Sequence, residues 1–202
     1  MGYHDIPSHL EALNIPVTAA ATASAPTDIF VTMDRWMNNY QPIDAVYLPA
    51  CISLQIQAQE YYLQQAGLTE SAIRSQYLKA AKDFYNGTID YTAFSKLTPS
   101  KLQDFIRPEF MAGGNTGEGP YWQSLEKCQA YRWRSHTPTY NYYGGSDEVV
   151  PVFIAKLPQE FHNVMGCGPT TAVYAGDKAD HRATFVYAVL HQKDWFDGFL
   201  KK

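Results

Sequence analysis

Short runs with strand-like composition alternate with helix-like spacing in the last third of the chain. Residues 139–143 (TYNYY) and 171–174 (TAVY) are β-branched and aromatic runs, each followed by a loop that contains Gly and Asp. Helical spacing follows each loop, over residues 154–161 from a start near Pro151 and over residues 183–200. This β-loop-α-β-loop-α order predicts an α/β fold built on parallel strands with flanking helices.

The first 28 residues predict one helix and one buried strand. Residues 8–13 are typical of the end of a helix, and Asn14 is a suitable stop. The run IPVTAAATASAP, residues 15–26, is made of small and β-branched residues without polar alternation. A strand of this kind is buried on both faces, as in a parallel sheet.

The middle of the chain is mostly helical in pattern. Leu48, Ile52 and Ile56 repeat at helical spacing, and a second helix is expected to start at Thr69 and continue through Ala81. Thr98-Pro99-Ser100 predicts another helix start, and GGNTGEGP (residues 113–120) predicts a loop.

The pattern therefore divides the chain into three parts. Residues 1–28 form a helix and a strand, residues 29–133 form a helical insertion, and residues 134–202 form the β-α-β-α unit.

Composition excludes several classes of protein. The 202 residues are 46% apolar, 14% aromatic and only 18% charged, which is far from the composition of a disordered chain. A net charge of −4 argues against a nucleic-acid partner, and no apolar run of about 18 residues is present to span a membrane. This length predicts one domain with an inserted subdomain.

Cysteine and histidine spacing indicates no metal site. Cys51, Cys128 and Cys167 are too few and too scattered for a disulfide framework or a zinc site. Two alternatives remain for them: one bridge between Cys128 and Cys167, or three buried free thiols. The six histidines form no metal-binding pair, so we expect neither a metal nor a cofactor.

Two polar residues stand directly after the two predicted strands of the last unit. Asp147 lies in the loop after residues 139–143, and His181 lies just before the last helix. The carboxyl ends of parallel strands carry the chemistry of such sheets. A carboxylate there can accept the Nδ1–H of a histidine on the next loop, fix its tautomer and stabilise the imidazolium.

The segments around these two residues resemble the C-terminal end of an α/β-hydrolase, whose triad runs in the order Ser, Asp, His. PTYNYYGGSDEVVP resembles the element that carries the triad acid, here Asp147, and AGDKADHRATF resembles the element that carries the triad histidine, here His181. PVTAAATASAPTDIF resembles the strand after the nucleophile in secreted lipase-like esterases, with Ala25 in place of a glycine. The resemblance implies that residues 29–133 are a helical lid or cap.

The nucleophile of that family is missing from this sequence. The only glycines four apart are Gly113 and Gly117, with Asn115 between them, so no G-x-S-x-G elbow is present. Ser146 precedes the acid as a turn residue, and Ser24 follows the first strand without the turn that exposes a nucleophile. The resemblance therefore places the expected serine, and the oxyanion-hole loop, upstream of Met1.

Three functions follow as expectations. The first is serine-hydrolase acyl transfer on carboxylic esters, with Asp147 orienting His181 as the general base. The second is peptide hydrolysis on the same scaffold, as in the prolyl-peptidase branch. The third is a non-catalytic, truncated chain that associates through its sheet edges.

The expected partners are a small-molecule ester, the missing N-terminal segment or a second copy of the chain. The resemblance implies a secreted or periplasmic protein, whereas MGYHDIPSHLEAL shows no signal peptide.

Overall fold

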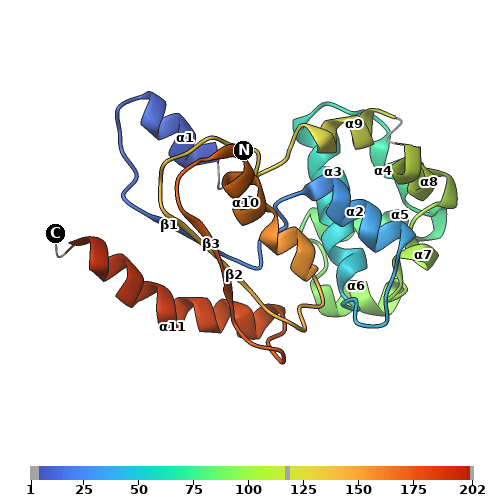
Figure 1. Cartoon of the computed structure of the whole chain (residues 1–202). Helices are drawn as coiled ribbons and strands as arrows, with labels where there is room; N and C mark the ends of the chain where they lie inside the picture. The colour runs from blue at the N-terminus through green and yellow to red at the C-terminus, as the bar shows by residue number, and fades with distance from the viewer. Residues whose placement is uncertain (1–4, 117–118, 201–202) are drawn as a thin grey trace. The chain divides into compact units, whose positions relative to one another are not determined.

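A computed structural model describes residues 5–116 and 119–200 of the chain. The chain forms two compact units (Figure 1). One unit combines the residues up to Thr32 with the residues from Cys128 onward, and the other comprises Met33–Lys127.

The first unit is built on a parallel sheet. Its strands are β1 (Ala20–Ala23), β2 (Thr139–Tyr143) and β3 (Thr170–Tyr174), and they pair in the order β1-β2-β3. Thr139 of β2 is the register partner of Ala20 on one side and of Thr170 on the other. The parallel strands and flanking helices confirm the fold class predicted from the sequence.

Helices cover both faces of this sheet (Figure 1). α10 (Val152–Met165) packs on β2 and β3, and α11 (His181–Leu200) packs on β1 and β2. Alternation along β2 separates the two faces. Tyr140 stacks on Trp195 of α11 with ring centroids 4.0 Å apart, whereas the Tyr143 ring lies 5.1 Å from the Lys156 ammonium of α10.

The N-terminal helix α1 (Asp5–Ala12) is tied to the chain just before β2. Glu11 accepts hydrogen bonds from the hydroxyls of Ser135 and Thr137 at 3.0 and 2.8 Å. The helix ends where the sequence predicts, and Asn14 takes a left-handed φ of 57°.

The second unit is helical. Within the described residues its helices are α2 (Ile29–Asn38, which begins in the first unit), α3 (Leu48–Tyr62), α4 (Leu68–Ala72), the 3₁₀ turn η1 (Ser75–Tyr77), α5 (Leu78–Tyr85), α6 (Tyr91–Leu97), α7 (Leu102–Phe105), α8 (Pro108–Thr116) and α9 (Pro120–Glu126). Its core includes Ile52 and Ile56 of α3, together with Phe94 and Phe105, whose rings meet edge to face at 6.0 Å.

The continuous helix expected from Thr69 to Ala81 is wrong. The chain leaves the helix at Ile73, which forms an antiparallel bridge with Ile106, and the flanking Arg74 N–H donates to the Phe105 carbonyl at 3.0 Å. The bridge inserts an extended residue between α4 and α5, so the helical pattern is divided among three short elements.

The loop expected over residues 113–120 is also partly wrong. α8 continues to Thr116, and residues 117–118 lie outside the described part of the chain. Gly114 allows α8 to pack closely on α2, because a Cβ at residue 114 would overlap the Asp34 carboxyl and crowd Asn38. The glycine therefore serves close helix packing rather than a turn.

The cysteines form no disulfide in the structure. Cys51, Cys128 and Cys167 are free, so the suggested Cys128–Cys167 bridge is wrong. The alternative of three buried thiols is wrong as well, because Cys51 and Cys128 are exposed. Among the described residues, no helix has the length and apolar character needed to cross a membrane.

The loops after β2 and β3 are joined backbone to backbone. The Gly145 N–H donates to the Gly176 carbonyl and the Ser146 N–H donates to the Ala179 carbonyl, both at 3.0 Å. A Cβ at Gly144 would overlap the Ala179 carbonyl oxygen and the Thr184 hydroxyl. The two loops therefore approach this closely only because residue 144 is a glycine.

Replacing that glycine is expected to destabilise the first unit. Gly144→Ala should lower the free energy of unfolding by about 1–3 kcal/mol, because the methyl group forces the loops apart. The matched control is Gly198→Ala in α11, where a Cβ meets open space. It should be neutral or stabilise by up to about 1 kcal/mol. Urea denaturation measures the free energy of unfolding of both variants. Equal values would contradict the close approach of the loops after β2 and β3.

Candidate active site

Asp147 and His181 meet at the carboxyl end of the sheet. The His181 Nδ1 atom lies 3.1 Å from Oδ1 and 3.3 Å from Oδ2 of Asp147. The Asp147 side chain is only 2% exposed, whereas the His181 side chain is 35% exposed. The structure thus brings together the two residues that the sequence singled out.

Backbone groups fix the orientation of the Asp147 carboxylate. Its Oδ1 atom also accepts the N–H groups of Val149 and Val150 at 2.9 and 2.8 Å. Burial by itself would raise the Asp147 pKa, but the hydrogen bonds from His181 and from these two amides, together with the nearby Ser24 hydroxyl, outweigh it and lower the pKa below its ordinary value. The carboxylate is therefore ionised at neutral pH.

The local charges favour a protonated His181. The hydrogen bond to Asp147 is the largest influence and raises the His181 pKa above 6.5, although burial opposes it. The charges of Asp147, Glu148 and Asp180 raise the pKa further. When the imidazole is neutral, Asp147 selects the tautomer in which Nδ1 carries the proton and Nε2 is the free base, because Nδ1 faces the carboxylate.

The start of α11 positions the imidazole. His181 is the first residue of the helix, and its backbone N–H donates to the Glu148 carboxylate at 2.9 Å. Asp180 caps the same turn by accepting the Ala183 N–H at 2.7 Å. Glu148 was not among the site residues predicted from the sequence, where its only signal is its place directly after Asp147.

Neither Ser24 nor Ser146 contacts His181 within the described part of the chain. Ser24 follows β1 with a left-handed φ of 47°, so it does occupy a turn that the sequence did not predict. Its hydroxyl is buried beside the Asp147 carboxyl and makes no hydrogen bond of normal geometry with the described residues. Ser146 donates to the Asp177 carbonyl at 2.7 Å, as a turn residue does.

The buried His162 of α10 is engaged at both ring nitrogens. His162 is held between the Thr170 hydroxyl at Nδ1 and the Trp133 carbonyl at Nε2, at 2.6 and 2.9 Å. Within residues 5–116 and 119–200, no group of three His, Cys, Asp or Glu side chains is arranged to hold a metal.

Comparison by sequence finds no matching protein-family model and no matching curated protein. Solved structures do match. The rice cell wall degrading esterase LipA from Xanthomonas oryzae superposes with a TM-score of 0.75 at 17% identity, over 94% of this chain and 52% of the esterase. A Legionella pneumophila protein to which hydrolase activity is attributed superposes with a TM-score of 0.79 at 14% identity, over 97% of this chain and 52% of the Legionella chain.

These similarities define the class of fold. The chain has the fold of the C-terminal part of an α/β-hydrolase. It spans about half the length of the solved structures that it matches.

The His181 pKa provides a direct test of the Asp147 contact. Asp147→Asn should lower the His181 pKa, because it removes the largest influence that raises it. Titration of the imidazole resonances by NMR measures the change. Asp177→Asn, a neighbouring acid without this contact, should leave the pKa unchanged; an unchanged pKa in Asp147→Asn would contradict the pairing.

The same shift predicts a pH dependence of stability. A folded-state pKa above the unfolded value means that the protonated form stabilises the fold. This contribution is complete below about pH 6.5 and is lost as the pH rises through the folded pKa. Urea denaturation of the native chain and of His181→Gln should therefore differ most at acidic pH. A difference that grows toward alkaline pH would contradict the assigned sign.

Proposed function

We propose that this chain supplies the acid and the general base of a serine-type acyl transfer that hydrolyses carboxylic esters. The observation that carries the proposal is the His181 imidazole: Nδ1 is engaged by a buried, ionised Asp147, while Nε2 has no partner among the described residues. A general base needs this arrangement, with one nitrogen oriented and the other accessible.

The reaction follows from that arrangement. Nε2 of His181 takes the proton of a serine hydroxyl while the serine oxygen attacks the carbonyl carbon of the ester. The π electrons of the carbonyl group move to the carbonyl oxygen, which becomes the oxyanion. The tetrahedral intermediate collapses, and the protonated imidazole gives its proton to the leaving alcohol. Water then repeats the sequence on the acyl-enzyme and releases the acid. Asp147 stabilises the imidazolium in both halves, in keeping with the raised His181 pKa.

In this proposal the nucleophile belongs to polypeptide outside these 202 residues. Ser24 lies buried beside the acid and Ser146 is held by Asp177, which argues against both. Among the described strands β1 pairs only with β2, so its other edge is available to a further strand. The matched structures are about twice as long as this chain, which supports a larger functional unit.

An ester is the preferred substrate because one structural neighbour is an esterase. In the same proposal the helical unit Met33–Lys127 acts as a lid that shields an apolar acyl group from water. No feature of the structure favours a peptide substrate. A proline-containing peptide is therefore the comparison substrate that tests the alternative.

The exposed surface of α11 supports association with further polypeptide. Phe185, Val186, Val189 and Leu190 are 48–68% exposed and form one apolar stripe on the helix. We propose that a second copy of the chain covers this stripe.

Activity of the isolated chain tests the acid–base pair. The chain should hydrolyse p-nitrophenyl acetate slowly, by imidazole catalysis, with a rate that rises as the pH passes the raised His181 pKa. His181→Ala should abolish this rate, whereas His191→Ala, an exposed histidine of the same helix, should retain it. Equal rates in the two variants would refute the role of His181.

Labelling with a fluorophosphonate, read by intact mass, tests the origin of the nucleophile. The chain should give no adduct. A stoichiometric adduct that is lost in His181→Ala would place an activated serine within these residues and contradict the proposal, and peptide mapping would identify it.

The association state tests the α11 stripe. Light scattering should show an oligomer for the native chain, and Leu190→Glu should shift it toward the monomer, because a charge on the stripe opposes its burial. Val164→Glu is the matched control, since Val164 is 85% exposed on α10. A monomeric native chain would contradict the proposed association.

A further inference from the structure

His181 occupies a place in the fold that is electrostatically unfavourable for a base. It is the first residue of α11, a helix of 20 residues. The N-terminus of a helix carries a partial positive charge of roughly half an elementary charge. This charge disfavours an imidazolium and can keep a histidine neutral. The acyl transfer proposed above requires His181 to accept a proton, so a negative charge is needed to offset the helix end.

Two consecutive acidic residues of the loop after β2 approach His181. Asp147 faces the ring, 3.1 Å from Nδ1, whereas Glu148 reaches the main chain, where its Oε2 atom accepts the His181 N–H at 2.9 Å. The first N–H groups of an α-helix have no acceptor within the helix. Glu148 therefore supplies one from outside, and a single loop holds both the ring and the backbone of the base.

The contact of Glu148 is separate from the ordinary cap of the helix. Asp180 provides that cap, because its side chain accepts the Ala183 N–H at 2.7 Å. Asp180 is the residue directly before α11, whereas Glu148 lies 33 positions away from His181 in the sequence. The helix end is thus capped by its own loop, and Glu148 adds a second carboxylate that contacts His181 itself.

The charges around the ring agree with this arrangement. The hydrogen bond to Asp147 is the largest influence that raises the pKa of the imidazole, and the charges of Glu148 and Asp180 raise it further. The cations nearest in the sequence, Lys178 and Arg182, are exposed, so water screens them. The carboxylates therefore outweigh the positive end of the helix.

We propose that Glu148 is a positioning residue of the base: its carboxylate holds the first amide of α11 and offsets the positive helix end, so that the His181 imidazole can accept a proton. The inference rests on the proposed acyl transfer, in which the base becomes an imidazolium. A Glu148 with a structural role alone would stabilise the helix end without changing the proton affinity of the ring.

Removing only the charge of Glu148 tests its effect on the ring in the whole chain. Glu148→Gln keeps a side-chain acceptor and should lower the His181 pKa, by less than Asp147→Asn does, because the Asp147 bond is the larger influence. The midpoint of the pH dependence of p-nitrophenyl acetate hydrolysis should move to lower pH by the same shift. Glu148→Asp, which retains the charge, should keep the pKa closer to its native value. An unchanged pKa in folded Glu148→Gln, checked by circular dichroism, would overturn the proposal.

Removing the acceptor as well tests the hold on the backbone. In Glu148→Ala the His181 amide should exchange its hydrogen with solvent about fivefold faster than in Glu148→Gln, because one hydrogen bond is lost. Hydrogen exchange followed by NMR measures both rates. Equal rates would contradict the contact between Glu148 and this amide.

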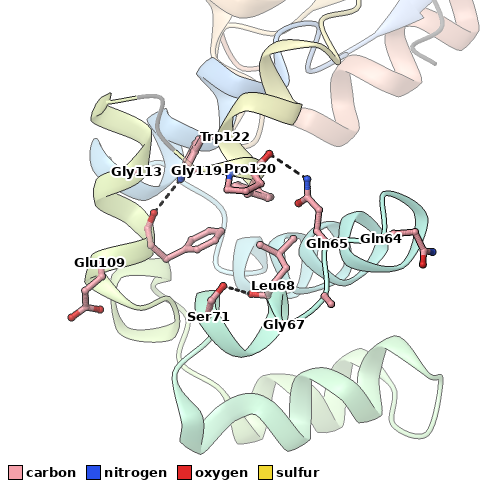
Figure 2. A pocket seen from close by; sticks show the side chains of 13 residues that line it. Gln64, Gln65, Gly67, Leu68, Ser71, Glu109, Gly113, Gly119, Pro120 and Trp122 are labelled. Carbon is pink, nitrogen blue, oxygen red and sulfur yellow. Dashed lines mark hydrogen bonds between the residues drawn. The ribbon is translucent and has the colours of Figure 1, made fainter.

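Two exposed acids serve as matched controls for the change of charge. Glu160→Gln lies on α10, and Glu109→Gln lies in the first turn of α8 in the helical unit, where Figure 2 labels it. Both should leave the His181 pKa unchanged. A shift as large as that of Glu148→Gln would assign the effect to the net charge of the chain and overturn the proposal. Hydrolysis that survives in His181→Ala would refute the proposed acyl transfer, whereas the pKa and exchange data judge Glu148 independently.

Discussion

The joining of two loops at the carboxyl end of the sheet determines the rest of the candidate site. Gly145 and Ser146 donate their N–H groups to the loop after β3, and Gly144 leaves no side chain between the two. Parallel strands bring such loops to one edge, and these bonds join the loops where the His181 Nδ1 atom lies 3.1 Å from Asp147. The tautomer of His181 and its raised pKa both follow from that distance.

Local signals in the sequence were sufficient for the sheet unit but not for the helical unit. Strands bounded by glycine turns placed Asp147 and His181 at the same sheet edge, and the structure agrees. The break in the predicted helix at Ile73 depends on pairing with Ile106, which is distant in the sequence and leaves no local pattern. The contact of Glu148 with the His181 backbone was missed for the same reason, because it forms only when the loops meet.

The two units contain polar groups of different character. In the sheet unit, the buried Asp147 carboxylate is satisfied by two backbone amides and an imidazole, so its charge is stabilised within the fold. In the helical unit, the buried Gln65 oxygen has no donor within the described chain. The cost of burying a polar group is therefore offset in the first unit and is not offset at Gln65 in the second.

The contacts of the Asp147 carboxylate have a consequence for how an enzyme with this site would be completed. Its two backbone bonds and its bond to His181 are all made within this chain. The orientation of the imidazole is therefore set during folding and not when a substrate arrives. In the proposed reaction, a serine hydroxyl would meet an imidazole whose orientational entropy has already been lost.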